Sequence, residues 1–225
     1  MKQNSMKTIV QIRQVAVVVA LLLTGLGHAQ NSDKAKTLLD EVYKKVKSYD
    51  NIYVDFKYAL ENKAENIKQE TRGDVTIQGE KYLFNYLGAT KIFDGKKVIT
   101  IIPENEEVVI ESPDTEDENT ITPSKMLTFY RSGYNYSWDM LQNVRGRQIQ
   151  YVKLVPIDTN SEAKEILLGI DAQTKHIYNL IQTGQNGTRT TITVNAFKTD
   201  QPLSGNLFKF NAKKYEDEGY YIIEQ

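Results

Sequence analysis

The feature that most constrains the fold of this chain is a succession of short β-strands between residues 73 and 110. The strands are separated by turns of only a few residues, so neighbouring strands must pair antiparallel, because a parallel crossover needs a much longer connection. Asp94-Gly95 is the strongest hairpin signal and predicts a type I′ turn, with positive φ at both residues. We therefore expect an antiparallel meander of four or five strands at the centre of the protein.

Several of these strands are apolar on both faces, whereas a solvated antiparallel sheet alternates apolar with polar residues. In the strand predicted at residues 82–87, Phe84 and Tyr86 lie opposite Leu83 and Leu87. One face of the sheet can then pack a core. The other face either lines an apolar hollow or packs a second core, and the pattern leaves both possibilities open.

The first 29 residues have the pattern of a secretion signal. A basic start precedes the apolar run at residues 15–26, and Gly27-His28-Ala29 is a small-x-small cleavage site. The apolar run is shorter than the roughly 20 residues that a membrane span needs. We therefore expect a cleaved signal peptide at residues 1–29, followed by one exported domain at residues 30–225.

The sequence contains no cysteine and has a formal net charge of −1. The absence of thiols excludes disulfides, thiolate chemistry and the lipid-modified cysteine of anchored bacterial lipoproteins. Removing residues 1–29 takes away three basic side chains and no acidic ones, which leaves a weakly acidic domain. Such a domain has no electrostatic basis for binding nucleic acid.

An amphipathic helix is predicted directly after the signal, with Ser32 or Asp33 as its cap. Its apolar residues are spaced by three and four, which places them on one face: Ala35, Leu38, Leu39, Val42, Val46 and Tyr49. The next segment, residues 52–60, alternates between apolar and polar residues and predicts a strand. Its apolar face carries Ile52, Val54, Phe56, Tyr58 and Leu60, and we expect the helix to pack on the sheet.

A second, short helix is predicted after Thr122-Pro123, since proline costs little at the first helical position. The helix carries Met126, Leu127, Phe129 and Tyr130, and Gly133 ends it. It is either a permanently packed core helix or a movable lid. The acidic stretch before it, residues 111–119, lacks the ligand spacing of an EF-hand and indicates a solvated loop.

Further strands are predicted at residues 134–141, 148–155, 165–170, 176–182, 189–197 and 207–210. The sequence thus predicts ten or eleven strands and two helices, a mainly β fold of the α+β class. The simplest arrangement is one large antiparallel sheet curved around a helix.

No group of residues in the sequence suggests catalysis or metal binding. His176 is the single histidine after the signal, so without cysteines the usual zinc sites are not available. The chain has no G-x-S-x-G elbow and no glycine-rich phosphate loop. We expect a protein that binds an apolar ligand without a metal or cofactor, and not an enzyme.

Several short motifs follow one another in a distinctive order. They are A-K-T-L-L-D-E-V from Ala35, Y-V-D-F from Tyr53, G-D-V-T-I from Gly73, Y-L-F-N-Y from Tyr82, F-D-G-K-K-V from Phe93, I-L-L-G-I-D from Ile166 and L-F-K-F from Leu207. In order and spacing this series resembles the LolA-type periplasmic outer-membrane lipoprotein carriers. The resemblance covers nearly all of the chain after the signal.

The resemblance implies an open antiparallel β half-barrel covered by the N-terminal helix and a short lid helix, with an apolar cavity for acyl chains. It implies no cofactor, acylated lipoproteins as cargo, an inner-membrane lipoprotein-releasing transporter and an outer-membrane acceptor, and we expect a monomer in the periplasm. The side chains expected to contact lipid share one face of their elements: Leu38, Leu39, Val42, Val54, Phe56, Tyr58, Val75, Ile77, Phe84, Tyr86, Met126, Leu127, Phe129 and Tyr130.

One departure from the family concerns the lid. Many proteobacterial members carry an Arg-Pro pair in the turn before the Y-L-F-N-Y strand, and this arginine helps to hold the lid closed. Here the turn is Gly79-Glu80-Lys81, so another contact must hold it. Two other functions stay open: an envelope-stress regulator of the same fold that binds lipid or polypeptide, and a secreted hydrolase, which the missing catalytic residues disfavour.

Overall fold

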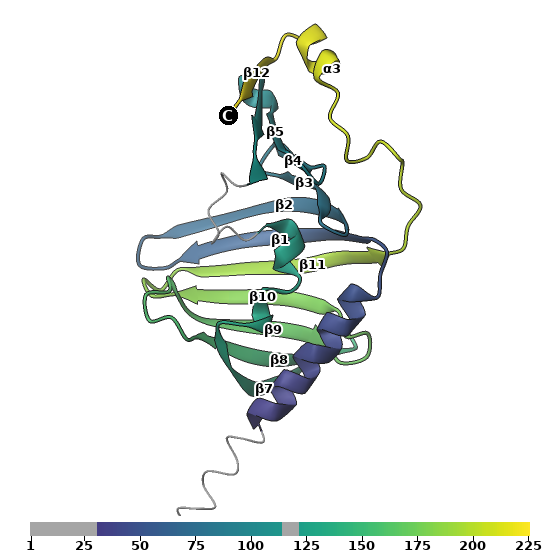
Figure 1. Cartoon of the computed structure of the whole chain (residues 1–225). Coiled ribbons are helices and arrows are strands. Elements are labelled where there is room, and N and C mark those ends of the chain that lie inside the picture. The colour runs from purple at the N-terminus through teal and green to yellow at the C-terminus, as the bar shows by residue number, and fades with distance from the viewer. Residues whose placement is uncertain (1–30, 114–121) are drawn as a thin grey trace, which may run out of the picture.

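The computed structural model describes residues 31–113 and 122–225 of the chain (Figure 1). These residues form one sheet of 12 strands in the order β12-β6-β5-β4-β3-β2-β1-β11-β10-β9-β8-β7. All described pairs are antiparallel except β12 with β6, which is parallel. The sheet curves without closing, which confirms the predicted open half-barrel. The predicted signal peptide and most of the predicted acidic loop lie outside the described residues.

The sheet consists of two antiparallel meanders that meet where β1 pairs with both β2 and β11. The first meander comprises β1 (Ile52–Asn62), β2 (Ile67–Gln78), β3 (Lys81–Tyr86), β4 (Ala89–Phe93), β5 (Val98–Ile102) and β6 (Glu107–Glu111). The second comprises β7 (Tyr134–Val144), β8 (Arg147–Pro156), β9 (Ala163–Asp171), β10 (Ile177–Gly184) and β11 (Arg189–Thr199). The chain returns to β6 through the short strand β12 (Tyr221–Glu224).

The helices are few and, apart from the first, short. The N-terminal helix includes residues 31–47. The others are the α-helices α2 (Pro123–Met126) and α3 (Ala212–Asp217) and the 3-10 turns η1 (Pro103–Asn105) and η3 (Phe129–Arg131). Ser32 and Asp33 are already helical, so the predicted cap at these residues is wrong.

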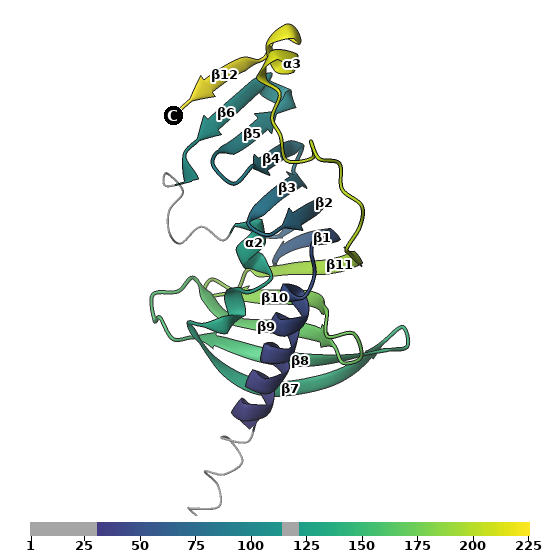
Figure 2. The same ribbon diagram turned by 45° about the vertical axis from the view of Figure 1, so that its right-hand side comes forward.

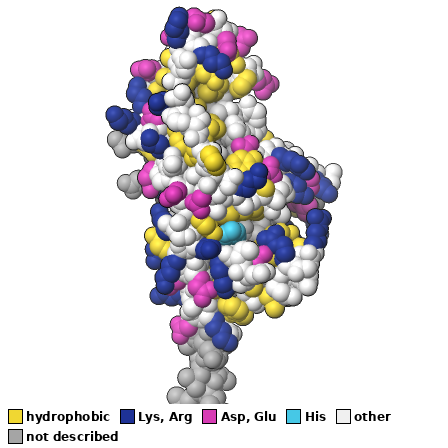
Figure 3. Space-filling model, turned by 90° about the vertical axis from the view of Figure 1, so that its right-hand side faces the viewer, with side chains coloured by type: hydrophobic (Ala, Val, Ile, Leu, Met, Phe, Trp, Pro, Cys, Tyr) yellow, Lys and Arg dark blue, Asp and Glu magenta, His cyan; other side chains and the backbone are white. Residues whose placement is uncertain are grey.

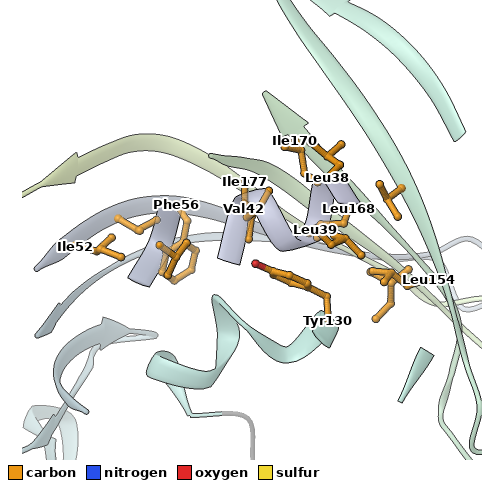
Figure 4. Packing of buried hydrophobic residues seen from close by; sticks show 14 of the residues in the cluster. Leu38, Leu39, Val42, Ile52, Phe56, Tyr130, Leu154, Leu168, Ile170 and Ile177 are labelled. Atoms are coloured by element: carbon orange, nitrogen blue, oxygen red, sulfur yellow. The ribbon is translucent and has the colours of Figure 1, made fainter. Parts of the chain in front are cut away.

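The predicted apolar stripe of the N-terminal helix is confirmed. Ala35, Leu38, Leu39, Val42 and Val46 are all buried, and Tyr49 packs against the same cluster just beyond the helix. This stripe lies on the inner, concave face of the sheet, against residues of β8 and β9 such as Leu154 and Leu168 (Figures 2 and 4). We call this set of buried residues the inner cluster.

Two predicted turns behave differently from expectation. Asp94 does not have positive φ, so the predicted type I′ turn at Asp94-Gly95 is wrong. The Asp94 carboxylate instead accepts hydrogen bonds from the backbone N–H groups of Lys96 and Lys97, at 2.7 and 2.9 Å. Leu87, predicted as the end of a strand, has φ of 52° and forms the β3–β4 turn with Gly88, whose φ is 78°. Positive φ at both central residues is the requirement of a type I′ hairpin.

The doubly apolar strands pack two separate cores, one on each face of the sheet. On the outer face, Leu83, Ile92, Ile99 and Ile110 stand side by side across β3 to β6. The chain segment after β11 covers them and buries Phe208 there (Figure 2). We call this the outer cluster. The strand predicted at residues 207–210 is therefore wrong, because these residues form a turn followed by irregular chain, which places Phe208 in the outer cluster.

Candidate functional site

A cavity of about 80 Å³ lies on the inner face of the sheet where the two meanders meet. Its walls come from β1, β2 and β3 on one side, from β9, β10 and β11 on the other, and from residues 122–131, which we call the cover segment and which contain α2 and η3. All the lining residues are apolar: Val54, Phe56, Val75, Ile77, Phe84, Pro123, Met126, Leu127, Phe129, Leu168, Ile177, Leu180, Ile192, Val194 and Phe197. The cavity is therefore suited to binding the hydrocarbon part of a ligand.

Eight of the side chains expected at the lipid site line this cavity: Val54, Phe56, Val75, Ile77, Phe84, Met126, Leu127 and Phe129. The other six do not. Leu38, Leu39, Val42 and Tyr130 belong to the buried inner cluster, and Tyr58 and Tyr86 pack against it without lining the cavity. The N-terminal helix thus fills the space beside the cavity instead of covering it. Lipid binding by the eight lining residues stays a prediction.

The second meander supplies lining residues that sequence reasoning missed. They are Leu168, Ile177, Leu180, Ile192, Val194 and Phe197, together with Pro123 of the cover segment. Val194 and Phe197 reach the cavity because β11 pairs with β1, opposite Phe56 and Val54. The alternation of apolar residues along β11 was a usable signal, but nothing local indicated that β11 lies beside β1.

The close packing around Gly73 explains why the G-D-V motif begins with a glycine. It pairs with Phe56 across β1 and β2, and a Cβ at this position would lie 2.6 Å from Cζ of Phe56 and 2.6 Å from the backbone oxygen of Asn85. Glycine within a strand permits such a close approach. The Phe56 ring can therefore lie over β2 and form part of the cavity wall.

Besides the packing of Leu127, Phe129 and Tyr130 in and against the inner cluster, three polar contacts stabilise the cover segment. The Thr122 side chain caps α2 by accepting a hydrogen bond from the Lys125 N–H at 3.4 Å. The Arg131 guanidinium lies 3.9 Å from the centre of the Tyr43 ring on the N-terminal helix, a cation–π contact. The Tyr136 hydroxyl donates to the Tyr130 backbone oxygen at 2.9 Å. Arg131 thus ties the cover segment to the N-terminal helix, far in sequence from the Gly79-Glu80-Lys81 turn.

Tyr130 places a polar group inside the inner cluster. Its side chain is fully buried, and its hydroxyl has no hydrogen-bond partner among the described residues. Figure 4 shows the ring beneath the N-terminal helix, with the hydroxyl directed among apolar side chains. Burial raises the pKa of Tyr130 far above its ordinary value. An unpaired buried hydroxyl costs about 1–3 kcal/mol, so it weakens the packing of the cover segment.

His176 connects the segment just after the N-terminal helix with the cavity wall. Its Nε2 lies 2.7 Å from the Tyr49 hydroxyl, and its ring stacks on Phe197 at 4.2 Å between centroids. Next to it, Lys175 forms an ion pair with Glu41 of the helix at 2.9 Å. Burial, together with nearby Lys45, lowers the pKa of His176. The histidine is visible on the face drawn in Figure 3 (cyan), and its contacts are those of a structural residue.

Two further observations concern residues 31–113 and 122–225. No cluster of histidine and acidic side chains in this part of the chain could hold a metal ion. No helix found there has the length and apolar character that crossing a membrane demands.

The fold and the cavity together define a class of protein: an open β half-barrel with an apolar cavity between its sheet and a short helical cover. The chain belongs to the family described as outer membrane lipoprotein carrier protein LolA, whose model matches residues 47–211. This confirms the resemblance seen in the motifs. A search among curated proteins finds none that matches the chain.

Several solved structures are similar to this chain at low sequence identity. An uncharacterized conserved protein from Thermus thermophilus is 11% identical with a TM-score of 0.54, covering 85% of this chain and 99% of its own. The Mycobacterium tuberculosis lipoprotein LppX is 11% identical with a TM-score of 0.50, covering 76% and 98%. A LolA superfamily protein from Nitrosomonas europaea is 10% identical with a TM-score of 0.40, covering 78% and 97%.

Proposed function

We propose that this protein is a periplasmic carrier that binds the acyl chains of lipoproteins in its cavity and moves them from the inner to the outer membrane. The observation that carries the proposal is a cavity with a wholly apolar lining, closed on one side by a short cover segment. The lining offers no group for acid–base or nucleophilic chemistry, which favours binding over catalysis. The partners proposed are an inner-membrane lipoprotein-releasing transporter and an outer-membrane acceptor.

The size of the cavity requires that it widen when a chain binds. At about 80 Å³ it is smaller than the roughly 150 Å³ cavity that admits a benzene molecule. Burying hydrocarbon contributes about 0.8 kcal/mol per CH₂, so one long acyl chain contributes roughly 10 kcal/mol. Fully burying one large apolar side chain contributes about 1.5–3 kcal/mol, so binding of the acyl chain can offset the uncovering of Leu127, Phe129 and Tyr130 of the cover segment.

Neighbouring residues of β11 provide a matched test. Val194 lines the cavity, whereas Thr193 lies on the outer face and pairs with Lys57. An apolar fluorescent probe should bind the wild type and be displaced by a diacylated lipopeptide. Val194→Glu should abolish probe binding because it places a charge in the cavity, and Thr193→Glu should bind the probe as the wild type does.

Two additional measurements make this test decisive. Val194→Phe fills the cavity without adding charge, so it should also weaken probe binding even if Val194→Glu fails to fold. Native mass spectrometry of protein purified from the periplasm should show a bound lipoprotein. Unchanged probe binding by a folded Val194→Phe variant, with no lipoprotein in the mass spectra, would refute the proposal.

A further inference from the structure

A row of four aromatic rings runs along the inner face of the sheet, from the cavity wall towards its rim. Phe56 and Phe84 line the cavity and stack at 6.1 Å between centroids. Tyr86 follows, stacked on Phe84 at 5.7 Å, and Tyr58 meets the edge of Tyr86 at 5.7 Å. The row therefore changes from phenylalanine to tyrosine where the cavity ends.

Burial along β1 shows in which direction the cavity approaches the solvent. Ile52, Val54 and Phe56 are buried, with 4%, 6% and 7% of their surfaces exposed. The next residues on the same face, Tyr58 and Leu60, are only half-buried. The end of the cavity near Ile52 is thus closed by the inner cluster, and the end near Tyr58 leads towards the rim.

Uncharged polar groups lie next to the two tyrosines on β1 and β2, whereas Lys91, which pairs with Phe84, carries a charge on the same face. Tyr58 pairs with Thr71, and Leu60 pairs with Gln69, so these four side chains share the inner face there. Neither tyrosine hydroxyl has a hydrogen bond to a described residue. Burial, followed by neighbouring Tyr58, raises the pKa of Tyr86, so its hydroxyl stays protonated as a donor at neutral pH. Neutral donors next to an apolar cavity can donate hydrogen bonds to an ester, whose carbonyl oxygens are acceptors.

We infer that Tyr58 and Tyr86 form a polar subsite that donates hydrogen bonds to the ester carbonyl oxygens of the ligand, with its hydrocarbon in the cavity. The inference rests on the proposed function and adds an orientation to it: the methyl ends lie beyond Val54, and the ester ends lie at the rim. Both tyrosines were expected at the lipid site, but as part of its apolar wall. In this inference they lie instead at the boundary between the apolar and the polar part of the ligand.

The test compares an ester with an ether. A synthetic diacylated lipopeptide carries ester carbonyl groups, and its dialkyl ether analogue has the same hydrocarbon without them. In the double variant Tyr58→Phe/Tyr86→Phe, the affinity for the diacyl lipopeptide should fall about tenfold, as expected for two lost neutral hydrogen bonds. The affinity for the ether analogue should stay at the wild-type value. Tyr53→Phe removes a hydroxyl from the opposite face of β1 and should change neither affinity.

The outcomes separate this inference from the proposed function. Equal affinities of wild type and folded double variant for the diacyl lipopeptide, or equal losses for ester and ether, would overturn the subsite and leave the carrier function standing. Failure of the wild type to bind either lipopeptide would overturn the carrier function and the subsite with it. A diacyl phospholipid as a third ligand identifies the source of the ester: the ligand that competes at the lower concentration is the preferred one.

Discussion

The contact between Arg131 and Tyr43 gives a measurable prediction for the cover segment. Arg131 is exposed, and its guanidinium lies 3.9 Å from the centre of the Tyr43 ring. A cation–π contact at an exposed site contributes about 0.5–1 kcal/mol. Arg131→Gln keeps much of the side-chain stem but removes the charge, so it should make opening of the cover segment about two- to fivefold more frequent.

Hydrogen exchange measures this opening directly. Without ligand, the amides of residues 125–130 should exchange faster than those of residues 52–60, because helices as short as α2 depend on tertiary contacts. In Arg131→Gln the amides of the cover segment should exchange about two- to fivefold faster still, with β1 unchanged. A diacylated lipopeptide should slow exchange in the cover segment of both proteins.

Lys198→Gln is the matched control, because Lys198 lies over the Tyr53 ring at 5.6 Å on the outer face. This variant should leave exchange in the cover segment at the wild-type rate. Equal protection of the cover segment and β1, unaffected by lipopeptide, would show that the cover is a fixed core element. Unchanged exchange in Arg131→Gln would show that Arg131 does not hold it.

Two further predictions concern stability. Gly73→Ala should lower the free energy of unfolding by about 1–3 kcal/mol and weaken probe binding, because the new Cβ meets Phe56 and the Asn85 backbone. Urea denaturation measures the change in the free energy of unfolding. Wild-type values of both the free energy of unfolding and probe binding would refute the close approach. For Asp171, burial would raise the pKa, but hydrogen bonds from the Thr174 backbone N–H and from Arg147 outweigh it and lower the pKa. The ionised Asp171 carboxylate therefore stabilises the fold above the ordinary aspartate pKa, and this stabilisation is lost as the pH falls through the lowered pKa of the folded protein. On acidification, the melting temperature of the wild type should drop more steeply than that of Asp171→Asn.

Local patterns predicted the elements of this fold well and their partners less well. The helix stripe and the alternating strand at residues 52–60 were found because each pattern lies within one segment. The pairing of β1 with β11 joins residues about 140 positions apart, such as Val54 and Phe197, and no local pattern encodes it. As a result, half of the cavity wall was missed, although the face of β1 and β2 that lines it was predicted.

The C-terminal part shows a second limit. L-F-K-F from Leu207 alternates as a strand should. Its aromatic residues instead pack in the outer cluster, where Phe208 is buried without any strand pairing. The strand that does form, β12, is short and pairs in parallel with β6, which lies more than 100 residues earlier. A four-residue strand at a sheet edge has too few residues for periodicity to mark it.

These two cores also determine where the cavity can widen. β3 carries the inner cluster on one face and Leu83 of the outer cluster on the other, and it is hydrogen-bonded to β2 and β4 along its length. Moving it would disturb both cores at once. The cover segment, by contrast, has a four-residue helix, lining side chains that are partly exposed except for Pro123, and a buried hydroxyl without a described partner at Tyr130. Displacing it restores water to that hydroxyl, so the least costly way to admit a chain is to move the cover segment and leave the sheet in place.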